Sequence, residues 1–299
     1  MMKDGHLGLW LWIVFAGCLF YSHYIDAQPD NRIPFNVGYY IKGVANVDQR
    51  DVDAALKIWS HEIGAMYGFD VHVNLYESMN QLVKDFAGNK LDFVSMQTID
   101  YFEYESDFKT KPEMASLKDD RVTIKYFLLV KADGEIKDLA HLRDKRCVMK
   151  KDNRLAMMYM DTVLLKAGLP DAEDFFADIR DKVKENQAAL SVFFGRADAC
   201  VISDIGFAMM SELNPQMGRK LKVLVSSDAL VDVVAFFHEN FPETSKKRAI
   251  QGIMQGVKQS KRAAQLKLLL NSAGMAPVTN RQLDGMRALW ADYHRLKVK

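Results

Sequence analysis

The stretch Asn186–Cys200, NQAALSVFFGRADAC, decides the fold, because it repeats the pattern of residues 80–94, NQLVKDFAGNKLDFV. In both stretches Asn-Gln opens a pattern with helical spacing, a short turn follows, and an aspartate precedes a short run of small or apolar residues. The two align without a gap, so that Asn89–Asp92 falls on Gly195–Asp198. Unless the match is a coincidence, the repeat predicts two lobes of one architecture.

Strands and helices alternate around each copy of the repeat. In the first passage the patterns predict strands at 35–41, 70–76 and 92–96 and helices at 51–67 and 78–87. In the second passage they predict strands at 146–149, 179–184 and 198–202 and helices at 155–167 and 186–194. This order indicates parallel sheets with right-handed crossovers.

The β-rich runs 122–132, 221–226 and 231–237 are long enough to leave one lobe and enter the other. The predicted fold is therefore α/β and two-lobed, each lobe a mostly parallel sheet flanked by helices, with two crossover strands as the hinge. Helices within 242–273 and 280–296 are expected to close the first lobe. The predicted domains are a signal peptide at 1–27, a first lobe at 28–122 and 229–299, and a second lobe at 123–228.

The N-terminus is typical of an exported protein. Leu7–Tyr21 carries no charge, and it is shorter than the about twenty residues that a membrane-spanning helix needs. Ile25-Asp26-Ala27 allows cleavage before Gln28. An uncleaved anchor is one alternative, and lipidation at Phe15–Cys18, which is similar to a lipobox, is another. We expect a periplasmic protein without a stable membrane span after cleavage.

Composition and motifs exclude several function classes. Forty basic and thirty-nine acidic residues give a net charge of +1, which argues against a dedicated nucleic-acid binder. The sequence contains no P-loop, GxSxG, GxGxxG or HExxH motif, so we expect no enzyme, no cofactor and no metal site. Cys147 and Cys200 lie in predicted strands, either as buried thiols or as a disulfide.

The chain resembles the periplasmic phosphonate-binding proteins of ABC transporters over about residues 34–290. The resemblance rests on matches in order at Phe35–Gly38, Asn89–Val94, Ile136–Arg146, Ala167–Leu169 and Gly195–Ala199. It implies the type II solute-binding fold, a small-molecule ligand and a membrane permease as partner. After the first strand of its second lobe this family commonly carries Asp-Pro-x-Ser-Thr-Ser-Gly, whose hydroxyls bind the phosphonate. Here Lys150–Ala156 reads KKDNRLA and lacks those hydroxyls.

Ligands of open α/β sheets bind beyond the carboxyl ends of the strands. The candidate ligand-binding residues at these ends are Tyr40, Ser78, Gln97, Thr98 and Tyr101 in the first lobe and Asn153, Arg154, Asn186, Ser203 and Asp204 in the second. Arg154 is the most informative, because a guanidinium at the start of a helix can grip a carboxylate or phosphate. Lys150 and Lys151 add positive potential; the alternative is a solvated basic loop.

Each of the other candidates also has a structural alternative. Ser78 and Asn186 fit plain helix N-caps. Tyr40 and Tyr101 either contact a solute or pack in the core. Asp204 either accepts a hydrogen bond from a ligand amine or hydroxyl, or pairs with Arg154.

The expected function is an extracytoplasmic solute-binding protein. It would close over a small anionic ligand, phosphonate-like, phosphate-like or a carboxylate, and deliver it to an ABC permease, acting as a monomer. The alternative is an accessory or sensory protein of the cell envelope that keeps the fold without transport and has a sensor as its partner.

Overall fold

The computed structural model describes residues 31–41, 49–150, 153–180, 184–260 and 272–297. The chain divides into two compact units, Met1–Ile33 and Pro34–Lys299, and the contacts discussed below belong to the second unit. The predicted signal peptide lies outside the described residues. Among the described residues, no helix has the length and apolar character needed to cross a bilayer.

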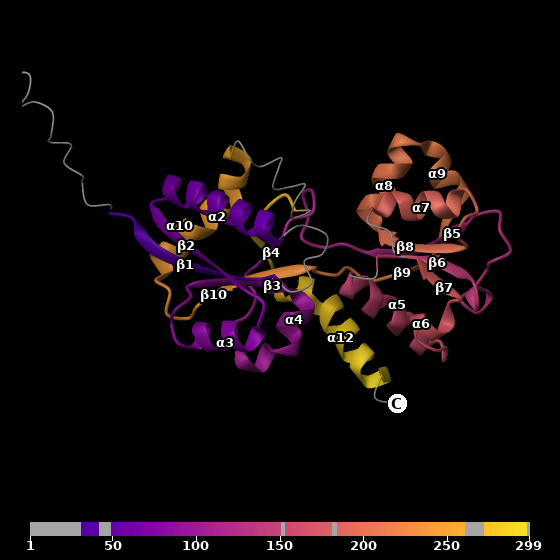
Figure 1. Ribbon diagram of the computed structural model, residues 1–299, viewed down its shortest axis with the longest axis horizontal. Coiled ribbons are helices and arrows are strands. Elements are labelled where there is room, and N and C mark those ends of the chain that lie inside the picture. The colour runs from indigo at the N-terminus through magenta and orange to yellow at the C-terminus, as the bar shows by residue number, and fades with distance from the viewer. Residues whose placement is uncertain (1–30, 42–48, 151–152, 181–183, 261–271, 298–299) are drawn as a thin grey trace, which may run out of the picture. The chain divides into compact units, whose positions relative to one another are not determined.

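The first sheet grows from short apolar segments of the first repeat. β1 (Ile33–Tyr40) buries Phe35 and Val37 and pairs in parallel with β3 (Phe93–Gln97). The strand order is β11-β4-β10-β3-β1-β2, with β2 (Phe69–Tyr76), β4 (Met114–Ser116), β10 (Val233–Phe237) and β11 (Met275–Pro277). Helices α2 (Gln49–Met66) and α10 (Glu243–Gln259) cover one face, and α3 (Met79–Ala87) and α4 (Thr98–Glu103) cover the other (Figure 1).

The second sheet has the order β7-β6-β8-β5-β9. Its strands are β5 (Tyr126–Lys131), β6 (Arg146–Val148), β7 (Asp178–Arg180), β8 (Ala199–Ser203) and β9 (Leu221–Ser226). Helices α5 (Arg154–Lys166) and α6 (Ala172–Phe175) lie on one face, and α7 (Glu185–Phe193), α8 (Asp204–Leu213) and α9 (Pro215–Lys220) lie on the other (Figure 1). Cys147 on β6 and Cys200 on β8 are free, buried thiols.

The two sheets use equivalent pairings, as the repeat predicts. Val37 is in register with Phe93 in the first sheet, and Cys147 is in register with Ala199 in the second. The α/β prediction is confirmed, but both sheets are mixed, not mostly parallel. The reason is that β10 runs antiparallel to β3, and β5 runs antiparallel to β8.

The connection between the sheets is made by irregular segments. β5 belongs wholly to the second sheet and β10 wholly to the first, so neither strand itself crosses between them. Residues 117–125 and 227–232 make the crossings instead, and Ile124 forms an antiparallel bridge with Leu230. Next to this bridge the Tyr126 N–H donates to Ser227 Oγ at 2.8 Å. We call these paired segments, which join the two sheets, the hinge.

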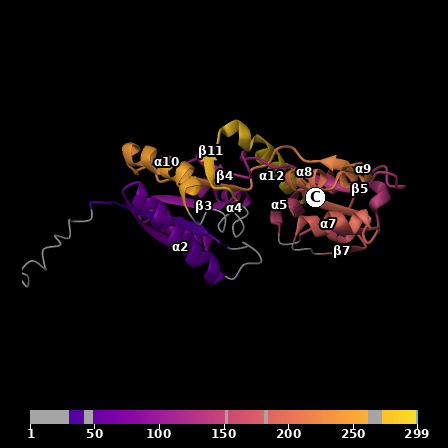
Figure 2. The ribbon, with the colours of Figure 1, turned by 90° about the horizontal axis from the view of Figure 1, so that it is seen from above.

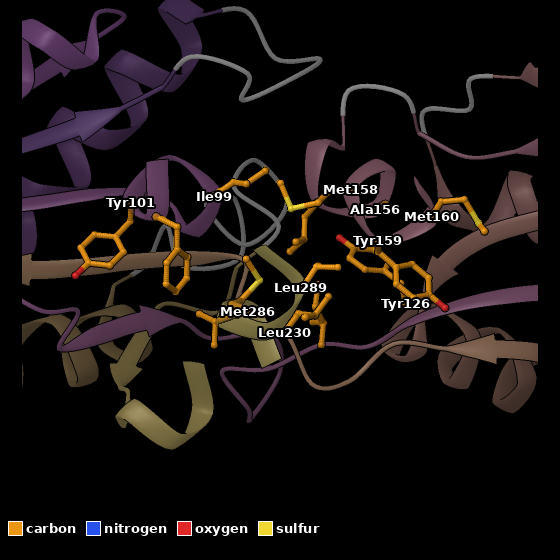
Figure 3. Packing of buried hydrophobic residues seen from close by; sticks show 14 of the residues in the cluster. Ile99, Tyr101, Tyr126, Ala156, Met158, Tyr159, Met160, Leu230, Met286 and Leu289 are labelled. Carbon is orange, nitrogen blue, oxygen red and sulfur yellow. The ribbon is translucent and has the colours of Figure 1, made fainter. Parts of the chain in front are cut away.

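The C-terminal helix departs from the expectation that it closes only the first lobe. α12 (Asp284–Lys297) contacts α4 of the first lobe and also α5 of the second. The view in Figure 2 shows α12 between the α4 and α5 regions. The hydrophobic core is therefore continuous from one sheet to the other, with Met286 and Leu289 of α12 inside it (Figure 3).

Candidate functional site

The start of α5 positions the most informative candidate, Arg154. Asn153 caps the helix, because its Oδ1 accepts a hydrogen bond from the Ala156 N–H at 3.0 Å. The same amide donates through Nδ2 to the Tyr126 hydroxyl at 2.8 Å, which fixes its rotamer. Arg154 is thereby the first helical residue, at the positive end of the helix dipole.

Arg154 reaches across to the first lobe. Its Nη1 donates to Asp100 Oδ1 at 2.6 Å, and its Nη2 lies 3.9 Å from Glu103 Oε2. Asp100 sits in the first turn of α4, immediately after β3, and its side chain is only 5% exposed. The Arg154 side chain is 40% exposed, so its Nη1 atom is anchored while part of the side chain remains accessible.

Tyr40 shares the surroundings of this ion pair. It is half-buried at the end of β1. Burial raises the pKa of its hydroxyl, and the negative charge of Asp100 raises it further, while Arg154 opposes both. The structure thus brings Tyr40, Asp100, Glu103 and Arg154 into one cluster, which we call the Arg154 cluster. A pocket of about 500 Å³ opens beside it, lined by Arg154, Glu103 and residues of α12.

Ser203 caps α8, and its surroundings are already filled by the chain. Its Oγ accepts from the Gly206 N–H at 3.0 Å and donates to Glu185 Oε2 at 2.7 Å. The Ser203 N–H also donates to Glu185 Oε1 at 2.8 Å. A Cβ on Gly206 would lie 2.1 Å from Glu185 Oε2, so only glycine leaves room for this carboxylate. Glu185 therefore occupies the position at the helix start where an external anion would bind.

Asp204 has a different partner from the one considered above. It pairs with Arg121 Nη2 at 2.9 Å and accepts a hydrogen bond from the Lys125 N–H at 2.9 Å. The idea that it pairs with Arg154 is wrong, because Arg121 on the connecting segment reaches it while Asp100 takes Arg154. Asp204 thus ties α8 to the hinge.

The two predicted N-caps have opposite outcomes. Ser78 caps α3, and its Oγ accepts from the Gln81 N–H at 3.4 Å. Asn186 is not a cap, because α7 begins one residue earlier, at Glu185, with Lys184 in the N-cap position. The Asn186 side chain is exposed.

Three first-lobe candidates lie at or below the surface of the sheet. Tyr101 is 1% exposed and packs against the rings of Phe108 and Phe236, and burial raises its pKa to about 12. Tyr101 therefore packs in the core, which was the structural alternative to contact with a solute. Thr98 is fully buried, and its N–H donates to the Asp232 carbonyl at 2.9 Å. Gln97 ends β3 half-buried.

Sequence reasoning missed the carboxylates that complete the site. Asp100 and Glu185 each stand in the first turn of a helix that contains a candidate residue, Thr98 in α4 and Asn186 in α7, and this acidic first turn was the available signal. Tyr126 and Arg121 carried no local signal. Lys151 lies outside the described residues. Among the residues with described positions, no group of three or more His, Cys, Asp or Glu side chains could hold a metal ion.

Comparisons with known proteins show which family the chain is similar to. A family model described as "ABC transporter, phosphonate, periplasmic substrate-binding protein" matches residues 43–283. A comparison with curated proteins gave no match.

Several solved structures are similar to this chain in fold. A Xanthomonas citri protein bound to chloride ion is 14% identical, with a TM-score of 0.57 over 89% of this chain and 99% of that one. PhnD1 from Prochlorococcus marinus in complex with methylphosphonate is 14% identical, with a TM-score of 0.55 over 88% and 98%. A binding protein of a Pseudomonas aeruginosa ABC phosphonate transporter is 13% identical, with a TM-score of 0.53 over 89% and 88%. At these identities the likeness shows the fold, that of the type II periplasmic binding proteins.

Proposed function

Because the chain belongs to the family of periplasmic phosphonate-type substrate-binding proteins of ABC transporters, we propose that it closes its lobes over a small anionic solute and delivers it to an ABC permease. The position of Arg154 is the observation that supports an anionic solute. It begins α5 and faces α4 of the other lobe, where it is held by Asp100. The expected localisation follows the family: export by a signal peptide at 1–27, or retention by a lipid or signal anchor.

The chemistry of Arg154 suits a phosphonate, phosphate, sulfonate or carboxylate group. A guanidinium offers five N–H donors in a fixed fork, of which the Asp100 contact uses the Nη1 edge. Arg154 is also the first residue of α5, so the positive end of the helix dipole adds to the charge of its guanidinium. Arg154 would take the place that hydroxyl side chains hold in the resembling family, and Tyr40 would add a hydroxyl from the first lobe.

Closure follows from contacts to both lobes. A solute that touches Tyr40 and Arg154 at once interacts better with the closed arrangement than with the open one, and it shifts the population by that difference. The motion would take place at the paired segments 117–125 and 227–232, since these connect the sheets. The closed lobes would then be the surface that a permease recognises.

One observation favours a second candidate, an accessory or sensory envelope protein. Asp100 already binds the Nη1 donor of Arg154, and Glu185 already occupies the anion position at the start of α8. If the Asp100–Arg154 pair, which joins the two lobes, is permanent, the lobes stay together without a solute, and the protein serves as a fixed interaction module. The two candidates differ in whether a small anion binds at all.

The test is a thermal-shift screen of the purified protein with phosphate, methylphosphonate, an alkylsulfonate and small carboxylates. A ligand at 100 times its dissociation constant adds about 2.7 kcal/mol of stability, which is a shift of several degrees. We expect at least one of these anions to raise the melting temperature of the wild type. The Arg154→Ala variant should lose that shift, and Arg154→Lys should keep part of it, because a lysine retains the charge but not the fork.

Arg281→Ala is the matched control, since Arg281 is an exposed arginine on η3 (Asn280–Leu283), outside the Arg154 cluster. It should shift as the wild type does. A cooperative melt with no shift for any anion class would contradict the proposal and favour the interaction module. A shift that persists in Arg154→Ala would leave solute binding standing and remove Arg154 from the site.

A further inference from the structure

The first half of α12 is fastened to α4 of the first lobe. Arg287 Nη1 lies 3.2 Å from Glu105 Oε1, just beyond α4, and its guanidinium lies 5.2 Å from the centre of the Phe102 ring. Trp290 stacks on the same ring, with the two centroids 6.3 Å apart. The Phe102 ring of α4 thus contacts both an arginine and a tryptophan of α12.

The second half of α12 is fastened to the second lobe by ion pairs. Asp292 Oδ2 lies 2.5 Å from Lys166 Nζ at the end of α5. Lys297 Nζ lies 2.7 Å from Asp171 Oδ2, the N-cap of α6, and 3.6 Å from Asp161 Oδ2 on α5. The hydrogen bond between Lys297 and Asp171 raises the pKa of the Lys297 amine and lowers the pKa of the Asp171 carboxyl. Charges on one helix therefore meet partners on two elements of the other lobe.

The buried face of the first half of α12 packs against the hinge. Met286 is fully buried and Leu289 is 9% exposed. They share a cluster with Leu230 of the connecting segment, Ile99 of α4 and Met158 of α5 (Figure 3). Residues of both lobes and of the hinge therefore contact one helix.

We propose that α12 is a clasp that sets the balance between open and closed lobes. With only the two connecting segments, the lobes could separate by bending at the Ile124–Leu230 bridge. With α12 in place, separation of α4 from α5 breaks the Arg154–Asp100 pair and also the contacts at one end of α12, either those with Phe102 and Glu105 or the weaker Lys166–Asp292 and Lys297–Asp171 ion pairs. Both lysine side chains are partly exposed, 53% for Lys166 and 35% for Lys297. Exposed ion pairs are individually weak, as suits a contact that must open and re-form. The clasp deepens the proposed function, since it regulates the closure on which solute binding rests.

The experiment measures the distance between the lobes without any solute. Spin labels are attached to Lys84→Cys on α3 and Glu135→Cys in the loop after β5, both exposed positions, in a Cys18→Ser background. Cys147 and Cys200 are fully buried, so they do not react. Pulsed electron–electron double resonance then gives the distribution of distances between the two spin labels. We expect a narrow distribution for the parent and an added longer-distance population for Lys166→Glu/Lys297→Glu.

Two variants separate a clasp from a general charge effect. Arg295→Glu makes the same change of charge on α12, but Arg295 pairs only within the helix, with Asp292 at 2.5 Å among the described contacts. It should keep most of the parent's narrow distribution, as should the conservative Lys166→Arg/Lys297→Arg. If the double glutamate variant does not fold, as judged by circular dichroism, Lys297→Glu alone carries the test.

A folded Lys166→Glu/Lys297→Glu protein with the parent's distribution would overturn the clasp. So would an Arg295→Glu protein that opens as far as the double variant. Neither result depends on the solute screen: the clasp can fail while Arg154-dependent anion binding stands, and anion binding can fail while the clasp stands.

Discussion

Asp92 and Asp198 occupy equivalent positions in the two lobes, and each fixes the turn after a helix to a neighbouring parallel strand, β1 in the first sheet and β6 in the second. In the first lobe Asp92 Oδ2 accepts from the Asn36 N–H at 2.7 Å and from Asn36 Nδ2 at 3.1 Å. In the second lobe Asp198 accepts from the Arg146 N–H and Nε, both at 2.9 Å, and from Nη2 at 3.0 Å. The carboxylate-to-backbone bond is common to both lobes, while the side-chain partner is an amide in one and a guanidinium in the other. The bond from the backbone N–H to the aspartate is therefore common to the fold of both lobes, whereas the charged partner, the Arg146 guanidinium, is present only in the second lobe.

The largest effect is expected from removing these aspartates. Asp198→Ala should lower the free energy of unfolding by about 2 kcal/mol, since it removes a carboxylate that accepts from a backbone N–H and a guanidinium. Asp92→Ala should cost less, about 1 kcal/mol, because its side-chain partner is neutral. Urea denaturation at pH 7 measures both. Asp133→Ala, at an exposed turn, is the control and should be close to neutral. An equal or greater loss in Asp92→Ala would break the comparison.

The next effect concerns the turns that precede these aspartates. Asn89 and Gly195 are equivalent and both adopt a left-handed backbone, with φ of 56° and 71°. Gly195→Ala should destabilise the protein by about 1 kcal/mol, because a Cβ is unfavourable at this φ. The added Cβ would meet only the flexible end of Lys131, at 3.2 Å from Nζ, so the cost lies in the backbone. Gly195→Asn should cost less than Gly195→Ala in the same denaturation experiment, as asparagine tolerates this conformation better. Equal losses would place the cost in the side-chain contact instead.

These local features explain why the fold could be predicted so far from the sequence. Helical spacing, an Asn or Gly turn and an aspartate before an apolar run all lie within about fifteen residues of each other, so one stretch contains the information. The mixed character of the sheets was not predictable in this way. It depends on where β5 and β10 insert, and their partners β8 and β3 lie far away in the sequence.

The candidate site shows the same difference between local features, which the sequence predicts, and long-range contacts, which it does not. Arg154 could be found because it stands at a helix start that follows a predicted strand. Its partner Asp100 is 54 residues away on the other lobe, and no pattern within either segment links them. The assignment of Asn186 as an N-cap failed for a related reason: Glu185 is drawn into the helix start by Ser203, a contact between residues 18 positions apart. Contacts between lobes are chosen by the assembled fold and leave little trace in local spacing.

A smaller effect should appear on acidification. The hydrogen bond from Arg146 holds the pKa of Asp198 below its usual range. A carboxyl with a depressed pKa in the folded state adds stability above its unfolded pKa of about 3.9, and this stability is lost as the pH falls through the folded value. Wild type should therefore exceed Asp198→Asn in stability at pH 6, and the gap should close below about pH 4. A gap that stays constant from pH 6 to pH 3 would mean that the brace works through geometry alone, as in the first lobe.

The smallest effect is expected at the first-lobe turn. Asn89→Gly relieves the strain of a Cβ at positive φ, but glycine also increases the freedom of the unfolded chain by about 0.4–1 kcal/mol. The change further removes the bond in which Asn240 Nδ2 donates to Asn89 Oδ1 at 3.0 Å. These terms nearly cancel, so the melting temperature should move little, whereas Asn89→Ala keeps the strain, loses the bond and should melt lower. A clear gain in Asn89→Gly would show that the asparagine side chain contributes nothing, and that the two turns differ only in how much strain each lobe tolerates.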